Sequence, residues 1–143
     1  MSNRLIPTVV LVLASVACFS TASRVTSDPM ACVERLTLPR YTPIASNARL
    51  TIEALTASVR LASDGTVQTI SLDSPPESKK KMLFFERPVE AALRGSTFRP
   101  GCGAVAVTLV FDFRLSTQGD EDGRVVFRHP NHFEVFDSRP VIQ

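Results

Sequence analysis

The clearest pattern in the chain is an apolar residue at every second position over residues 105–113. The odd positions there are all apolar: Val105, Val107, Leu109, Phe111 and Phe113. A period of two is typical of a β-strand that buries one face. We therefore predict a strand over residues 104–115. Its other face would display Thr108, Val110, Asp112 and Arg114.

A similar alternation occurs twice in the first half of the chain, over residues 55–62 and 67–73. The pair Asp64-Gly65 lies between the two runs, and this dipeptide is favoured in two-residue hairpin turns. The sequence therefore predicts a β-hairpin. Before it, the Pro-bounded segment 38–43 predicts an extended entry, and "IASNARL" predicts a short helical turn.

One main helix is predicted between the hairpin and the long strand. Pro88 prevents a regular helix over the whole of residues 74–95, since proline lacks an N–H and is tolerated only in a first turn. We place Pro88 in the first turn of a helix from about Glu86 to Arg94, which ends at Gly95. The side chains expected to face the core are Val89, Ala92 and Leu93, supported by Phe84 or Phe85.

The C-terminal part of the chain predicts an acidic turn over residues 116–123, followed by two short strands around the turn from His129 to His132. No internal repeat or long linker divides the chain. The prediction is therefore one α+β domain. It has an antiparallel β-β-α-β sheet with one packed helix, extended by a C-terminal hairpin over residues 116–143.

Composition limits the function. The 143 residues are 44% hydrophobic, which is enough to bury a core. The net charge of +2 comes from 16 basic and 14 acidic side chains mixed along the chain, so no basic stripe for nucleic acid is present. No serine-nucleophile, phosphate-loop or zinc-protease motif occurs. We expect neither an enzyme nor a cofactor.

The first 22 residues have the make-up of a secretory signal: Arg4, an apolar run from Val9 to Phe19, and small residues before Ala22. Cleavage after Ala22 would leave residues 23–37 as a loose N-terminal segment and place the protein in the periplasm or outside the cell. Two alternatives stay open. The stretch from Leu5 to Ser23 is long enough for an uncleaved anchor, and Cys18 is a candidate for lipidation.

Export changes the cysteine count, because Cys18 leaves with the signal. Cys32 and Cys102 then remain as a pair in an oxidising compartment, and we predict a disulfide between them. The alternative is two buried, unpaired thiols.

Other motifs are weaker indications of a binding site. His129, His132 and Glu134 are residue types that bind metals, yet "HPNH" is more simply a turn, and no metal is expected. The acidic run Asp120–Gly123 lacks the spaced ligands of a calcium loop. Residues 79–81 are three lysines that predict a solvated face or a weak contact with anionic lipid.

Two long stretches resemble the C-terminal domain of the TonB energy-transducer family. "LPRYTPIASNARLTIEALTASVRLASDGTVQTISL" has its Pro-x-Tyr entry, short helix and Asp-Gly hairpin. "FFERPVEAALRGSTFRPGCGAVAVTLVFDFRL" has its Phe-Glu-Arg helix start, aromatic-x-Pro loop and last long strand. The resemblance spans residues 38–115.

The resemblance implies a periplasmic module of a Gram-negative cell that binds outer-membrane transporters. In the family, a receptor segment lies alongside the last strand by β-strand addition. Here that strand is 104–115, and the candidate partner-binding residues are Thr108, Val110, Asp112 and Arg114. Because sequence alternation alone does not distinguish an edge strand from a central one, a purely structural role for this strand stays open.

Three hypotheses follow. The first is an exported module that binds an envelope protein, with a homodimer left open, and that does not itself transduce energy. The second is a minimal transducer anchored by Leu5 to Ser23. It departs from the family because neither histidine lies in the apolar segment and the spacer of about 15 residues is far too short to cross the periplasm at ~3.3–3.6 Å per residue. The third is a small secreted enzyme or inhibitor on the same scaffold.

Overall fold

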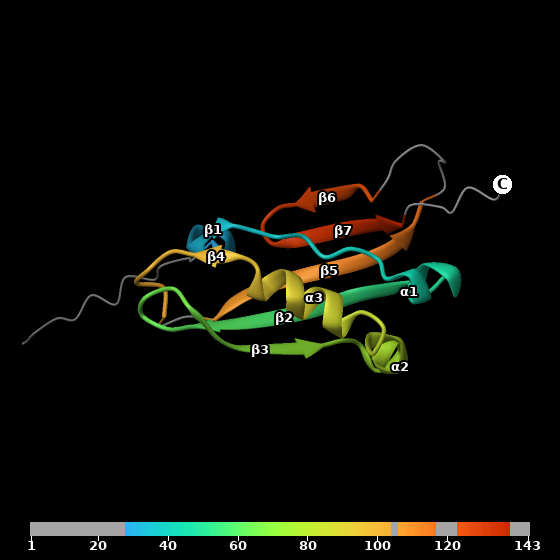
Figure 1. Ribbon diagram of the computed structural model, residues 1–143, viewed down its shortest axis with the longest axis horizontal. Helices are drawn as coiled ribbons and strands as arrows, with labels where there is room; N and C mark the ends of the chain where they lie inside the picture. The colour runs from blue at the N-terminus through green and yellow to red at the C-terminus, as the bar shows by residue number, and fades with distance from the viewer. Residues whose placement is uncertain (1–27, 104–105, 117–122, 138–143) are drawn as a thin grey trace, which may run out of the picture.

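The computed structural model of the chain describes residues 28–103, 106–116 and 123–137, which form a small α+β domain (Figure 1). A five-stranded sheet has the order β3-β2-β5-β7-β6. Its strands are β2 (Ile52–Leu61), β3 (Val67–Asp73), β5 (Val107–Leu115), β6 (Val125–Arg128) and β7 (His132–Asp137). The helices are α1 (Pro43–Asn47), α2 (Lys79–Met82) and α3 (Glu86–Arg94), with one-turn 3-10 segments at Pro29–Cys32 and Pro76–Ser78.

Helix α3 begins and ends where the sequence predicts. Pro88 lies in its first turn, and Gly95 is its C-cap. The predicted inward residues Val89, Ala92 and Leu93 are all buried. Of the two preceding aromatic residues, Phe85 is fully buried and Phe84 is exposed. The apolar spacing of the helix therefore fixes which of its sides packs on the sheet.

The first hairpin is also confirmed. β2 and β3 pair antiparallel around the Asp64-Gly65 turn. Gly65 has a φ of 89°, a conformation that favours glycine, and the Asp64 carboxylate accepts hydrogen bonds from the Thr66 N–H and hydroxyl. Opposite β5, the register of β2 shifts between Ile52 and Leu55 at the positive-φ residue Ala54.

The core lies between α3 and one face of the sheet. β5 contributes its odd residues, which are buried as predicted: Val107, Leu109, Phe111 and Phe113. The Phe85 ring packs on Phe113 with centroids 4.5 Å apart, and Tyr41 meets both rings edge-on. Phe111 stacks on Phe133 of β7. The aromatic residues thus join α3, the entry segment and the C-terminal hairpin in one core.

One part of the predicted topology is wrong. The C-terminal residues do form an antiparallel hairpin, β6–β7, but it is the second strand, β7, that pairs with β5, and it does so in parallel. The sheet is therefore mixed rather than antiparallel. The physical reason is apolar matching, because parallel register sets Phe133 beside Phe111 and Val135 beside Phe113 on the core side.

The N-terminal segment also differs from expectation. Residues 23–37 were expected to be loose, but Pro29–Cys32 forms a 3-10 turn and β1 (Val33–Arg35) pairs with β4 (Thr97–Phe98). A disulfide joins Cys32 to Cys102, with Cα atoms 5.9 Å apart, which confirms the predicted pair. The covalent bond and the two-stranded pairing together hold this segment against the domain.

Several expectations fall on residues that the structure does not describe. These are the export signal over 1–22 with Cys18, strand residues 104–105, and most of the acidic turn. In the described ranges, no helix is long and apolar enough to span a membrane.

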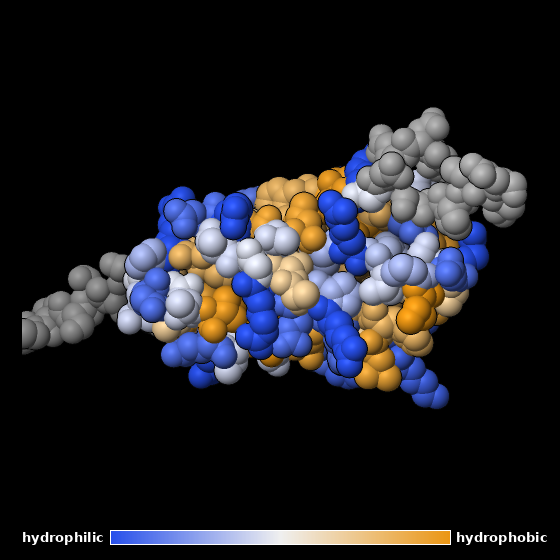
Figure 2. Space-filling view, viewed as in Figure 1, coloured by the Kyte–Doolittle hydropathy of each residue, from blue (hydrophilic) through white to orange (hydrophobic). Residues whose placement is uncertain are grey.

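Hydrophilic and apolar residues are interspersed on the α3 side, and some of the apolar patches lie toward the end that carries α1 and α2 (Figure 2). The large exposed apolar side chains at these elements are Ile44, Leu83 and Phe84. The three lysines of α2 are exposed, and Lys79 forms an ion pair with Asp73. This pair weakens the alternative in which all three lysines face a lipid surface.

Candidate functional site

The four predicted partner-binding residues lie together on the sheet face that α3 does not cover. Thr108 and Val110 are half-buried, Arg114 is exposed, and Asp112 is 4% exposed. Across the strands, Val110 is level with Thr56 of β2, and Asp112 is level with Glu134 of β7. No described helix lies over this face (Figure 1). The alternation in the sequence therefore predicted the correct face.

β5 itself is a central strand. β2 pairs with one of its edges and β7 with the other. The Val110 N–H donates to the Asn131 carbonyl (2.9 Å), and the Asn131 side chain donates to the Thr108 carbonyl (2.8 Å). The backbone of β5 therefore has no free edge. A partner strand would pair with β5 from Val110 to Leu115 only after β7 had been displaced.

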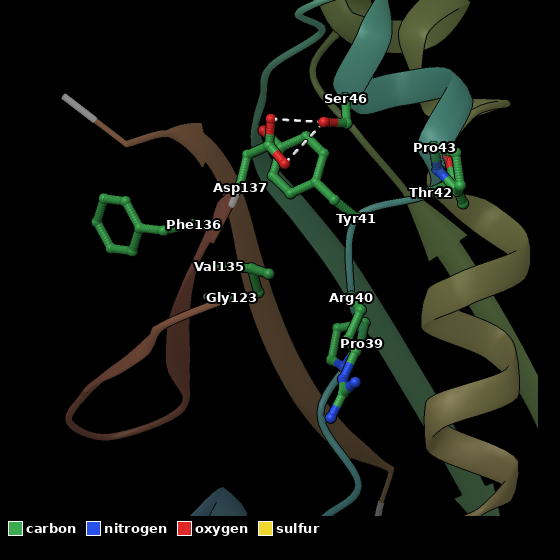
Figure 3. Close-up of a pocket in the computed structure, with 10 residues that line it drawn as sticks. All are labelled: Pro39, Arg40, Tyr41, Thr42, Pro43, Ser46, Gly123, Val135, Phe136 and Asp137. Atoms are coloured by element: carbon green, nitrogen blue, oxygen red, sulfur yellow. Dashed lines mark hydrogen bonds between the residues drawn. The ribbon is translucent and has the colours of Figure 1, made fainter. Parts of the chain in front are cut away.

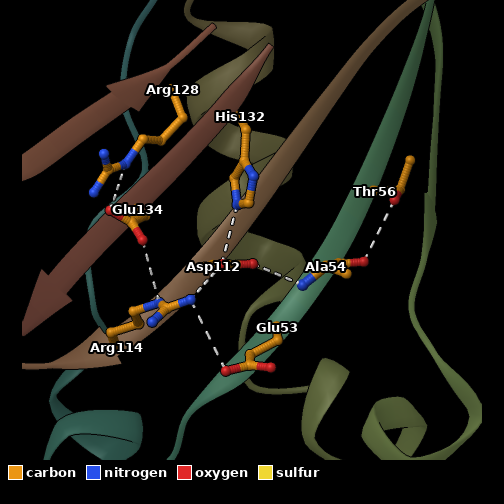
Figure 4. Close-up of polar contacts among 8 residues, drawn as sticks. All are labelled: Glu53, Ala54, Thr56, Asp112, Arg114, Arg128, His132 and Glu134. Carbon is orange, nitrogen blue, oxygen red and sulfur yellow. Dashed lines mark hydrogen bonds and ion pairs between the residues drawn. The ribbon is translucent and has the colours of Figure 1, made fainter. Parts of the chain in front are cut away.

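Asp112 is the centre of a polar network on the open face (Figure 4). One carboxylate oxygen accepts the Ala54 N–H at 2.8 Å, which holds the irregular part of β2 in place. The other oxygen lies 3.0 Å from the Arg114 guanidinium and 3.0 Å from His132 Nε2. Three strands thus meet at a single, almost buried carboxylate.

Arg114 extends the network outward. Its guanidinium lies 3.6 Å from Glu134 and 4.0 Å from Glu53, and Glu134 also pairs with Arg128 at 3.2 Å. Arg128 and Glu53 are well exposed, so their pairs contribute little to stability. Removing a partner from Asp112 should cost more, because that carboxylate is almost buried and would be left without the groups that offset its desolvation.

The groups around Asp112 shift its pKa in opposite directions. Burial alone would raise its pKa, whereas the Ala54 N–H, the Arg114 guanidinium and the charge of His132 lower it. The net result is an Asp112 pKa below the ordinary value. The folded state therefore favours the ionised carboxylate more than the unfolded chain does.

This sets a pH dependence. A carboxyl group with a depressed pKa in the folded state stabilises above its unfolded pKa of about 3.9, and this contribution is lost as the pH falls through the folded pKa. We expect Asp112→Asn to be less stable than wild type at pH 7 by about 1–3 kcal/mol, and the difference to shrink below about pH 4. Urea unfolding from pH 7 to pH 2.5 measures both. A difference that stays constant over this range would contradict the assignment.

The histidine pair does not form a metal site with Glu134. His132 lies against Asp112, and Glu134 lies between two arginines. Over residues 28–103, 106–116 and 123–137, no group of three or more His, Cys, Asp or Glu side chains is placed to hold a metal ion.

Two outer edges of the described five-stranded sheet are open, those of β3 and β6, and the β3 edge is the longer. Successive residues of a strand direct their backbone groups to opposite sides. The Val110 N–H points to β7, so the backbone groups of the preceding residue, Leu109, point to β2, where they bond to Ala57. The next residue of β2, Ser58, therefore directs its backbone groups to the other side, toward β3. It follows that Ser71 bonds to β2.

The same alternation turns the N–H and C=O groups of Ile70 and Leu72 outward, and none of the described strands pairs with them. Sequence reasoning missed this edge because the order of the strands in the sheet depends on contacts between distant segments.

Comparison with known proteins identifies no relative. No protein-family model matches the chain, and no curated protein matches it either.

Proposed function

We propose that the chain is an exported, non-enzymatic protein-binding module, similar to the TonB C-terminal domain, which recognises an envelope or outer-membrane transport protein. It binds an extended segment of that partner by β-strand addition, and the segment pairs with the outer edge of β3. The observation that carries the proposal is the pair of outward-facing backbone groups at Ile70 and Leu72.

The composition of β3 favours its outer edge over the outer edge of β6 as the binding site. Residues 69–72 are Thr-Ile-Ser-Leu, without charge or proline, the features with which proteins usually protect an edge. β6, at the opposite edge, is only four residues long and ends at Arg128, which pairs with Glu134. A partner strand would therefore find a longer edge at β3, which is uncharged from Val67 to Leu72 and has a charge only at its last residue, Asp73.

The side chains of β3 define the partner segment. Ile70 and Leu72 are level with the buried residues Val59 and Ala57, so they point to the α3 side of the sheet. Thr69 and Ser71 point to the open, polar side. An added strand continues both faces, so the segment should alternate apolar residues beside Ile70 and Leu72 with polar residues on the other side.

The disulfide supports the exported location. Bonds of this kind persist in oxidising compartments and are rare in the cytosol. The Cys32–Cys102 bond closes most of the domain, from the N-terminal turn to the loop before β5. Together with the signal-like N-terminus, it favours function in the envelope.

A proline variant tests the edge without breaking the β2–β3 ladder. Because the Leu72 N–H faces outward, Leu72→Pro removes a bond only from the added strand. The matched control is Leu72→Val, which keeps the N–H. We expect the tagged full chain to retain an envelope partner in a pull-down as wild type and as Leu72→Val, and to lose most of it as Leu72→Pro.

Thermal unfolding of each variant checks that the domain still folds. If Leu72→Pro does not fold, Ile70→Pro with Ile70→Val provides the same comparison at the next outward position. Equal recovery of the partner by a folded proline variant and by its valine control would refute binding at this edge.

A further inference from the structure

A cavity of about 530 Å³ lies between the segment before α1 and the end of β7 (Figure 3). Its walls include the apolar side chains Pro39, Pro43 and Val135 and the ring of Tyr41, whereas the Phe136 ring points away from them (Figure 3). Asp137 and Ser46 meet on its polar side. The cavity is remote in sequence from β3 and uses none of the residues assigned to strand addition.

Asp137 is only 4% exposed, yet the described residues leave it incompletely partnered. The Ser46 hydroxyl lies 2.9 and 2.8 Å from the two carboxylate oxygens. A hydroxyl has one proton to donate, whereas an ionised carboxylate offers about four acceptor sites. Within the described ranges, no Lys, Arg or His lies at ion-pair distance from Asp137.

The neighbouring groups do not fill this deficit. The Tyr41 hydroxyl donates to the Leu50 carbonyl at 3.0 Å, so its proton is committed elsewhere. Burial and the negative charge of Asp137 raise the Tyr41 pKa, which keeps the phenol neutral. The Arg40 side chain points away from Asp137 (Figure 3), and the Arg124 guanidinium lies over the Phe136 ring.

We propose that this cavity binds the cationic side chain of a lysine or arginine from another protein, with Asp137 as its counter-ion. An ammonium or guanidinium group supplies the donors that a shielded carboxylate requires. The apolar and aromatic walls accommodate the alkyl stem of the same side chain. An anionic group would be repelled by Asp137, and a purely apolar group would leave the carboxylate desolvated without a donor.

The test uses a small cation and its neutral isostere. The probes are N-acetyl-arginine N-methylamide and N-acetyl-citrulline N-methylamide, which have similar shapes but differ in charge. The readout is amide NMR of the full ¹⁵N-labelled chain, as processed in cells, at Tyr41, Ser46 and Asp137. We expect saturable shifts with the arginine probe and binding weaker by about tenfold or more with citrulline.

Asp137→Asn removes the charge but retains the shape and an acceptor for Ser46, so it should abolish the preference for arginine. Asp64→Asn, in the exposed β2–β3 turn, is the control and should leave the preference intact. The proposal is overturned if the two probes shift the cavity amides equally in wild type, if neither shifts them up to about 100 mM, or if folded Asp137→Asn binds arginine as wild type does. Should Asp137→Asn fail to fold, the comparison of probes on wild type alone decides.

Discussion

Replacing Phe85 with alanine is expected to lower the free energy of unfolding by about 3–5 kcal/mol. Phe85 is fully buried, and its ring packs on Phe113 and Tyr41 with centroids 4.5 and 5.7 Å away. Removing its ring deletes these aromatic contacts at the start of α3 and leaves a cavity that the neighbouring rings do not refill.

The adjacent residue provides a matched control. Phe84 is 42% exposed, so Phe84→Ala should cost less than about 1 kcal/mol. Urea or thermal unfolding of the two variants measures the contrast directly. Similar losses of stability at both positions would mean that α3 packs in another orientation.

Loss of the disulfide is the second large effect. Cys32 and Cys102 are 70 residues apart, and closing a loop of this size stabilises by about 4 kcal/mol on the chain-entropy account. The bond also fixes the N-terminal turn and β1 beside the loop that leads into β5. We therefore expect Cys102→Ser to lower the thermal midpoint strongly.

The double variant Cys32→Ser with Cys102→Ser separates the bond from the effect of a lone thiol, and it should lose as much stability as the single variant. Wild type treated with reductant should fall to the same midpoint. Two free thiols by mass spectrometry of the exported protein, or a midpoint unchanged by these substitutions, would count against a stabilising bond.

Local patterns in the sequence predicted local structure well. α3 was predictable because Pro88 and Gly95 set its limits and its apolar spacing set its buried side. The β2–β3 hairpin was predictable because Asp64-Gly65 specifies the turn. In each case, the residues that decide the structure lie within a few positions of one another.

What the sequence did not predict depends on contacts between distant segments. The parallel pairing of β7 with β5 requires the apolar match of Phe133 with Phe111, which no local pattern reveals. The order in Val33–Arg35 depends on β4, more than 60 residues later.

The candidate site, too, was predicted where it depends on local sequence and was missed where it depends on contacts between distant segments. Alternation in β5 assigned Asp112 and Arg114 to the open face correctly. It did not reveal that His132 and the Ala54 N–H converge on Asp112, because these contacts depend on strand order and on an irregular position in β2. Strand order also moved the proposed pairing edge from β5 to β3.

Photo-crosslinking in cells tests this edge most directly. A benzophenone amino acid replaces the exposed Ser71 in β3, and controls carry it at Arg128 in β6 and at Arg87 in α3, both also exposed. Strand addition at β3 predicts an adduct with an envelope protein at Ser71, little at the controls, and loss of the Ser71 adduct when Leu72→Pro is added. An adduct that is strongest at Arg128, or one at Ser71 that persists in the folded Leu72→Pro variant, would contradict it.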